Sequence, residues 1–303
     1  MNEIELYNKS IFYLTRSVWN DWFDQTYAVV KGVPLSQLCY GDIGKRKSID
    51  IDVLISKESV QRFETVLISK GFTPLYLSGN RESRIFHMAC SHQITPYYKI
   101  VDDSIITIDI NHSIMWGEYE GEKIDVDEFC SDCQTMNIAG ARIKILSPMK
   151  ALIHLILHAY KDMNSIYILA SRKKIDRCAF RDIYTLLVNN IQNMDMNVLY
   201  EYCHKLGVVP YIFYMLYYTN ILYGSELLGR YVEKFKTQEG LLLLNSYGLC
   251  AKERKQWGVD FLTRLDSEDL FRIIKDDLSK DDLKKIEVNK YFLRGRANES
   301  SIT

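Results

Sequence analysis

The stretch "VVKGVPLSQLCYGDIGKRKSIDIDVLIS", residues 29–56, decides how the rest of the chain is interpreted. Its last third is an apolar run that aspartate interrupts twice, at Asp50 and Asp52. Side chains two residues apart on a strand point to the same side. We therefore expect both carboxylates on one face, with Ile49, Ile51 and Val53 on the other. Burying a carboxylate is costly unless something pairs with it, so this face requires a partner.

A divalent cation is the partner that the chemistry favours. Two carboxylates a few ångströms apart repel each other, and a cation between them removes that cost. Oxygen ligands suit Mg²⁺ or Mn²⁺, and Mg²⁺ usually combines one or two carboxylates with the phosphates of a substrate. The sequence thus predicts that Asp50 and Asp52 hold Mg²⁺ (or Mn²⁺) together with a nucleotide.

Residues upstream of the pair are candidates for binding phosphate. Gly41 and Asp42 lie in a predicted turn whose exposed amides are available to phosphate oxygens. Arg46 and Lys31 are the cations that we expect to neutralise a triphosphate. The spacing places Arg46 between the turn and the strand.

A third carboxylate, Asp109, is embedded in the strand-like run "IITIDIN" at residues 105–111. If this strand lies beside the first, three carboxylates can hold two metal ions, an arrangement that clamps the attacking and leaving oxygens in nucleotidyl transfer. Asp109 is also placed to accept a proton from an attacking hydroxyl.

This pattern resembles the bacterial uncharacterised nucleotidyltransferase family, within the nucleotidyltransferases related to DNA polymerase beta. That family has a Lys-Gly, then Tyr-x-Asp, then an arginine four residues before Asp-x-Asp. In this chain the pattern falls on Lys31, Gly32, Tyr40, Asp42, Arg46, Asp50 and Asp52. The resemblance covers about residues 26–190, because "SPMKALIHLILHAYKD" and "FRDIYTLL" are similar to helical segments of the same family.

The resemblance implies Mg²⁺-dependent transfer of a nucleoside monophosphate from an NTP to a hydroxyl or similar acceptor. Asp50, Asp52 and Asp109 would hold the metals, and ATP is the nucleotide that we expect. One position departs from the broad superfamily, which has Gly-Ser where this chain has Gly41-Asp42. An aspartate at that position repels phosphate.

Periodicity predicts an α+β fold with two domains. Residues 1–146 mix helix-period segments with strand-like runs, and we expect a mixed sheet of the nucleotidyltransferase type with flanking helices. Residues 147–303 begin with Ser147 as a helix cap and Pro148 at the first helical position, and are almost entirely helix-period after that. We predict a catalytic domain over residues 1–146 and a mainly helical substrate or partner domain over residues 147–303.

The net charge, the cysteines and the apolar runs of the sequence restrict the classes of partner that we expect. A formal net charge of −1 gives no bulk attraction to nucleic acid or to an acidic membrane, so we expect a small-molecule, peptide or protein acceptor and no large nucleic acid. Seven scattered cysteines indicate reduced thiols in a cytoplasm. No apolar run has the length and composition of a membrane span, so the sequence predicts no membrane partner.

Other interpretations stay open. Asp42 favours a catalytically degenerate, antitoxin-like binding or regulatory protein. Asp-x-Asp alone also occurs in manganese-dependent glycosyltransferases and on solvent-facing edge strands. His154 and His158 are one helical turn apart but lack the glutamate of a zinc protease, and we expect them to be packing residues.

Two further motifs have ordinary explanations. Cys130 and Cys133 form a C-x-x-C, which is either a structural or redox pair or two ordinary thiols in a loop. The aromatic run "YIFYMLYY", residues 211–218, is predicted to belong to a core because its apolar residues follow a helical spacing.

Overall fold

The computed structural model describes residues 2–75, 87–89, 91–102, 104–117, 119–172 and 174–293. The chain divides into two compact units, which are described separately. The first comprises Met1–Gly117, Lys123–Leu152 and Thr185–Asn193, and the second comprises Glu118–Glu122, Ile153–Tyr184 and Met194–Thr303. The boundary between residues 146 and 147 stays a prediction.

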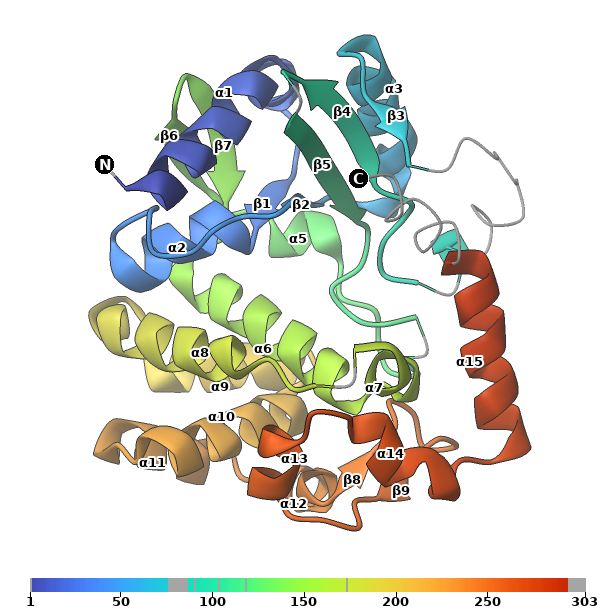
Figure 1. Cartoon of the computed structure of the whole chain (residues 1–303). Helices are drawn as coiled ribbons and strands as arrows, with labels where there is room; N and C mark the ends of the chain where they lie inside the picture. Colours follow the sequence, from blue (N-terminus) through green and yellow to red (C-terminus); the bar gives the residue numbers. More distant parts are fainter. Residues whose placement is uncertain are drawn as a thin grey trace. The chain divides into compact units, whose positions relative to one another are not determined.

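A mixed sheet forms the centre of the first unit, as the α+β prediction requires (Figure 1). Within the described residues it has seven strands in the order β3-β4-β5-β2-β1-β7-β6. The pairs β2–β5 and β1–β7 are parallel, and the other neighbours are antiparallel. The strands are β1 (Ala28–Val30), β2 (Ile51–Leu54), β3 (Thr73–Pro74), β4 (Tyr97–Val101), β5 (Ser104–Asn111), β6 (Gln134–Ile138) and β7 (Ala141–Ile145).

Two helices, α1 (Glu3–Trp22) and α3 (Val60–Ser69), bury one face of this sheet. Trp19 of α1 and Phe63 of α3 are fully buried, and their ring centroids lie 6.1 Å apart. Alternate residues of the strands, such as Val53 of β2, point into the same core. The period of two therefore separates an apolar face from an opposite face that carries the polar residues of β2 and β5.

Short helices and a tight turn complete the first unit. α2 (Gly32–Tyr40) follows β1 directly, η1 (Lys57–Ser59) precedes α3, and α5 (Val126–Phe129) precedes β6. Residues 185–193, the end of α8 and η2 (Ile191–Asn193), also belong to this unit. Asn189 Nδ2 donates to the Cys39 carbonyl at 2.7 Å, which fastens them to the end of α2.

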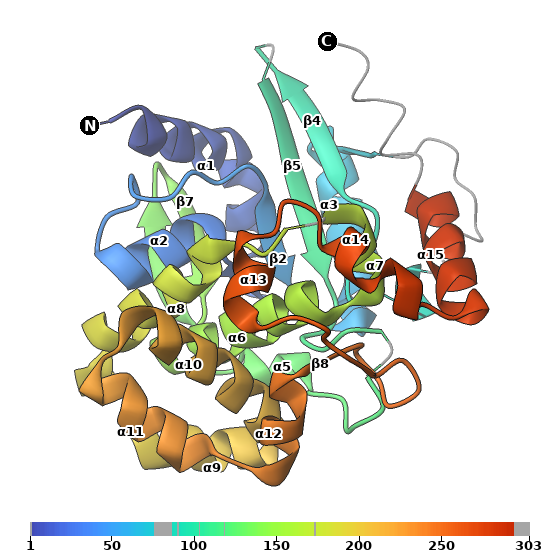
Figure 2. The same ribbon diagram turned by 60° about the horizontal axis from the view of Figure 1, so that its bottom comes forward.

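The second unit is mainly helical (Figure 2). Its helix α10 packs against α9, α11 and α12, and α7 packs against α14 and α15. A short hairpin of β8 (Ser246–Tyr247) and β9 (Lys255–Gln256) adds the one pair of strands in the described part of this unit. The helices are α6 (Pro148–Asn164), α7 (Ile166–Arg172), α8 (Arg177–Asn189), α9 (Met196–Lys205), α10 (Val209–Tyr223), α11 (Glu226–Phe235), α12 (Gln238–Leu244), α13 (Phe261–Asp266), α14 (Leu270–Ile274), η3 (Lys275–Asp277) and α15 (Lys280–Leu293).

The aromatic run of α10 is core, as predicted. Tyr214 is fully buried and packs edge-on against Tyr160, with ring centroids 5.0 Å apart. Tyr218 stacks on Phe261 at 3.9 Å. Arg264 is also buried, and its guanidinium donates to the Tyr218 hydroxyl at 2.7 Å, so this charge has both a hydrogen bond and aromatic neighbours.

Several local predictions were wrong. The strand expected over "SIDIDVLI" starts only at Ile51, and Ile49 is 80% exposed instead of packing with Val53. One of the strand-like runs expected within residues 1–146 is "RIFHMA", residues 84–89; its residues 87–89 are helical, and the rest of it lies outside the described residues. The strand β6 was missed because its residues Gln134, Thr135 and Asn137 are polar and exposed. In the described ranges, no helix combines the length and apolar character needed to cross a bilayer.

Candidate functional site

The register between β2 and β5 brings two of the predicted carboxylates together. In this parallel pair Asp52 is the partner of Asp109, so their side chains point to the same side of the sheet. Ile51 and Ile108 beside them belong to the core on the other side. The strand of Asp109 thus lies beside the strand of Asp52, which is the arrangement that the three-carboxylate hypothesis requires, although the two residues are 57 positions apart in the chain.

Asp52 is buried and held by two neighbours. Lys31 Nζ lies 2.8 Å from Asp52 Oδ1, and Asn111 Nδ2 donates to the same oxygen at 3.2 Å. The side chains of Lys31 and Asp52 are 16% and 8% exposed, so their ion pair is largely shielded from water. The ammonium supplies the positive charge that a carboxylate at this depth needs.

Lys31 and Gly32 start α2, and their backbone is unusual. Lys31 has φ +57° and Gly32 has φ +39°, a region that a glycine adopts without strain. A Cβ on Gly32 would lie 2.4 Å from Ser48 Oγ, so no larger residue fits without a shift. Ser48 Oγ is buried and has no hydrogen-bond partner among the described residues. The helix therefore begins with a close backbone approach and a buried hydroxyl beside it.

The Gly41-Asp42 turn lies at the other end of α2. Gly41 is the left-handed cap of this helix, and its N–H donates to the Gln37 carbonyl at 2.8 Å. Asp42 Oδ1 accepts from the Gly44 N–H at 2.7 Å, so Asp42 closes its own turn. A helix of nine residues is about 13 Å long, and its carboxyl end carries partial negative charge. Gly41 and Asp42 thus follow the carboxyl end of α2, whereas Lys31, which contacts Asp52, precedes its amino end.

The segment between that turn and β2 is fixed by a buried asparagine of α1. Asn8 Nδ2 donates to the carbonyls of Ile43 at 2.6 Å and Arg46 at 2.8 Å, and Asn8 Oδ1 accepts from the Ser48 N–H at 3.1 Å. Arg46 is half-buried in this segment, and half-buried Asp50 directly precedes β2. Asn8 therefore sets the path by which the chain enters the strand of Asp52.

Three contributors were missed in the sequence. Asn8 is signalled by a polar residue on the apolar face of α1, and Gly32 by a glycine directly after a buried strand. Asn111 is two residues after Asp109 on the same strand, and its amide donates to Asp52. His112 follows it and is buried, and this burial lowers the pKa of its imidazole.

The donor set suits a hard cation only in part. Asp52 and Asp109 offer carboxylate oxygens, the ligands that Mg²⁺ prefers. Among the residues that the structure describes, no group of three His, Cys, Asp or Glu side chains stands ready to hold a metal ion. Two carboxylates are enough only where substrate phosphates complete the coordination.

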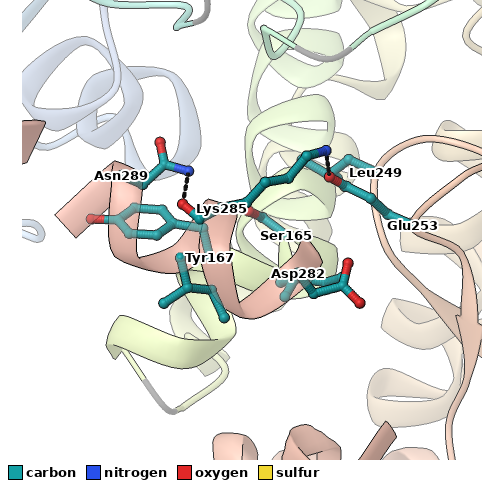
Figure 3. Close-up of a pocket in the computed structure, with 9 residues that line it drawn as sticks. Ser165, Tyr167, Leu249, Glu253, Asp282, Lys285 and Asn289 are labelled. Atoms are coloured by element: carbon teal, nitrogen blue, oxygen red, sulfur yellow. Dashed lines mark hydrogen bonds and ion pairs between the residues drawn. The ribbon is translucent and has the colours of Figure 1, made fainter. Parts of the chain in front are cut away.

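The second unit contains a separate polar pocket, drawn in Figure 3. It lies between the start of α7, the loop that follows β8, and α15. Lys285 Nζ of α15 reaches Glu253 Oε1 at 2.5 Å across it, and Asp282 of α15 pairs with Lys255 Nζ at 2.7 Å. These two ion pairs hold α15 to the segment that contains Glu253 and Lys255.

The histidine pair of α6 makes contacts within its own helix. The rings of His154 and His158 stack with centroids 6.4 Å apart. His158 also lies 3.5 Å from Asp162 Oδ2 and 3.4 Å from Lys161 Nζ.

Comparison with known proteins identifies the family to which the chain is similar. The model of the family described as "uncharacterised nucleotidyltransferase" matches residues 24–224. A crystal structure of an antigenic nucleotidyltransferase-like protein from Paracoccidioides brasiliensis is similar, with 15% sequence identity and a TM-score of 0.36 over 60% of this chain and 75% of that chain. A search of curated proteins finds no match.

Proposed function

Because the chain belongs to the uncharacterised nucleotidyltransferase family, we propose that it is an active, metal-dependent enzyme. The reaction moves a nucleoside monophosphate from an NTP, with ATP expected, to a hydroxyl of a small molecule, a peptide or a protein. Pyrophosphate is the other product. The formal net charge of −1 supports an acceptor smaller than a large nucleic acid.

The observation that carries this proposal is the pairing of Asp52 with Asp109 across β2 and β5. Carboxylates side by side on the face turned away from the core are costly to keep unless they do chemistry there. The family match covers both residues. Asp52, Asp109 and the preceding Asp50 are the residues that we propose to hold Mg²⁺ or Mn²⁺, which neutralises the phosphates when bound.

Lys31 has two roles in this proposal. Without nucleotide its ammonium neutralises Asp52, at 2.8 Å. Asp52 would hold the metal ion when one is bound, and the Lys31 ammonium would then be available to neutralise the phosphates. The negative charge of Asp52 is therefore paired with a positive charge both without and with the nucleotide, so the site avoids an unpaired buried charge.

The start of α2 is where we place the phosphates. A helix amino terminus offers unpaired N–H groups and partial positive charge to an anion. Gly32 leaves room for close approach, and the buried Ser48 hydroxyl lies beside it. This assignment moves the phosphate contact from Gly41 and Asp42 to Gly32, while Arg46 and Lys31 remain its proposed cations. Asp109 is the proposed acceptor for the proton of the attacking hydroxyl.

The test is label transfer from each of four NTPs, labelled at the α-phosphate, to a cell extract in the presence of Mg²⁺. We expect one NTP to label a product, and Asp52→Asn and Asp109→Asn to reduce labelling to background. Asp24→Asn is the matched control, because Asp24 is an exposed aspartate of the same unit. Equal labelling by the Asp52→Asn/Asp109→Asn double variant and the wild type would refute the proposal.

A second candidate is a nucleotidyltransferase-fold protein that binds or regulates without catalysis, as an antitoxin-like protein does. The Lys31–Asp52 ion pair favours it, because the carboxylate is already compensated without a metal ion. Calorimetry separates the two candidates. If the chain is an enzyme, the wild type binds Mg²⁺–NTP and the Asp50→Asn/Asp52→Asn variant does not. If it is degenerate, neither the wild type nor the variant gives a heat of binding.

A further inference from the structure

The C-x-x-C of the first unit forms a tight turn between α5 and β6. Cys130 caps α5, and the Cys133 N–H donates to the Cys130 carbonyl at 3.3 Å, the bond of a β-turn. A β-turn brings its first and fourth Cα atoms within 7 Å, which overlaps the range that a disulfide spans. Both cysteines are free thiols, and their side chains are hydrogen-bonded to each other.

The two thiols have different surroundings. Cys130 is buried at 3% exposure, whereas Cys133 is partly exposed. The hydrogen bond between the side chains, followed by burial, raises the pKa of Cys130. The same hydrogen bond lowers the pKa of Cys133 and outweighs burial and the Asp132 carboxylate, which raise it; the ammonium groups of Lys150 and Lys144 lower it further. Cys133 is therefore the reactive thiol, with Cys130 beside it.

The turn also fixes the cation that favours the thiolate. Lys150 Nζ lies 2.5 Å from Asp132 Oδ1 and 5.5 Å from the centre of the Phe129 ring, and its side chain is 7% exposed. Ser147 Oγ donates to Asp132 Oδ2 at 3.3 Å, which ties the turn to the start of α6. Asp132 lies between the cysteines in sequence, so the same contacts hold the turn and position Lys150.

We propose that Cys130 and Cys133 are a thiol–disulfide modification site whose reaction partner is a small-molecule disulfide. The Cys133 thiolate attacks one sulfur of that disulfide, forming a mixed disulfide and releasing one thiolate. Cys130 then loses its proton and attacks Cys133 Sγ, which releases the second thiolate. The protein gives up two electrons and two protons, and the small disulfide is reduced to two thiols. This proposal is independent of the nucleotidyl transfer.

The first test measures which cysteine reacts, in the full-length protein. Brief alkylation at neutral pH followed by peptide mapping should modify Cys133 about tenfold faster than Cys178, although Cys178 is the more exposed. Burial of its thiol raises the pKa of Cys178, which makes it the matched control. Cys130→Ser and Lys150→Met should each slow alkylation of Cys133. The pH profile of the wild-type rate gives the same information if a variant does not fold.

The second test equilibrates the protein with mixtures of reduced and oxidised glutathione. We expect a loss of two of the seven thiols and a cross-linked peptide containing Cys130 and Cys133. Cys178→Ser should behave like the wild type, and Cys130→Ser should stop at a mixed disulfide on Cys133. Faster alkylation of Cys178, retention of all seven thiols, or a zinc ion bound by both cysteines would each overturn the proposal.

Discussion

At the scale of the residue, the site depends on how one buried carboxylate is compensated. Asp52 has Lys31 and Asn111 on the same oxygen, and the three come from β2, the start of α2 and the end of β5. The Asp-x-Asp motif indicated that the carboxylate needed a cation. It did not indicate that a lysine of the chain supplies one, because that contact depends on the neighbouring strand β1.

Lys31→Met should lower the free energy of unfolding by about 2 kcal/mol, since it leaves a buried carboxylate with only an amide partner. Chemical denaturation at neutral pH measures the change. Lys45→Met, at an exposed lysine, should change it by less than about 0.5 kcal/mol. A double variant with Asp52→Asn should recover part of the loss, and a purely additive double variant would contradict the coupling.

Gly32→Ala should destabilise the protein by about 2 kcal/mol, because the new Cβ lies 2.4 Å from Ser48 Oγ and φ is +39°. The contrasting variant is Gly229→Ala in α11, where nothing lies within 4 Å of the added Cβ. That change should raise the free energy of unfolding by about 0.5–1 kcal/mol. Thermal melting of both variants checks the prediction, and equal effects would argue against a tight contact at Gly32.

At the scale of the element, the start of α15 is fixed by hydrogen bonds between two residues that are three positions apart in the sequence. Ser279 Oγ accepts from the Asp282 N–H at 3.2 Å, and Asp282 Oδ2 accepts from the Ser279 N–H at 2.8 Å. This reciprocal pair is a capping box with aspartate in place of glutamate, and "SKDD" is legible in the sequence. The buried residues of this helix are few, with Ile286 among them, so the cap marks its start more clearly than its periodicity does.

Asp282→Asn should cost about 1–2 kcal/mol and remove part of the acid sensitivity of the second unit. Burial opposes ionisation of Asp282, but hydrogen bonds from Lys255 and Ser279 outweigh it and lower its pKa below the usual range. A lowered pKa in the folded state means that the stabilisation is complete above about pH 4 and is lost as pH falls through the folded value. Melting curves from pH 3 to pH 6 measure this dependence.

The control for that experiment is the adjacent exposed residue. Asp281→Asn should keep the wild-type decline of melting temperature below pH 4, whereas Asp282→Asn should flatten it. An equally steep decline in both variants would show that other carboxylates govern the acid response.

At the scale of the whole molecule, the proposed reaction combines a nucleotide with an acceptor smaller than a large nucleic acid, a proposal that agrees with the formal net charge of −1. The charges that matter are local, at the face carrying Asp52 and Asp109, and do not appear in the formal net charge of −1. Binding should therefore depend on the metal ion more than on bulk electrostatics.

Mg²⁺ and the preferred NTP together should raise the melting temperature by several degrees, and either alone should have little effect. Ligand at about 100 times its dissociation constant stabilises the native state by about 2.7 kcal/mol. Adding EDTA should reverse the shift, and Asp52→Asn/Asp109→Asn should abolish it. A shift of equal size with NTP in EDTA would contradict a metal-dependent site.

Local pattern determined much of this protein: the strand carrying Asp52, the strand carrying Asp109, the change to helices after Ser147 and the buried aromatic run of α10. These features follow from periodicity and from residue chemistry within short windows, which the sequence contains in full. Only the tertiary structure decided that Asp52 is the strand partner of Asp109, that Lys31 neutralises Asp52, and that the amino end of α2, with Gly32, follows directly on this ion pair. Those facts depend on strand order and register between residues far apart in the chain, and no local pattern specifies which strand lies beside which.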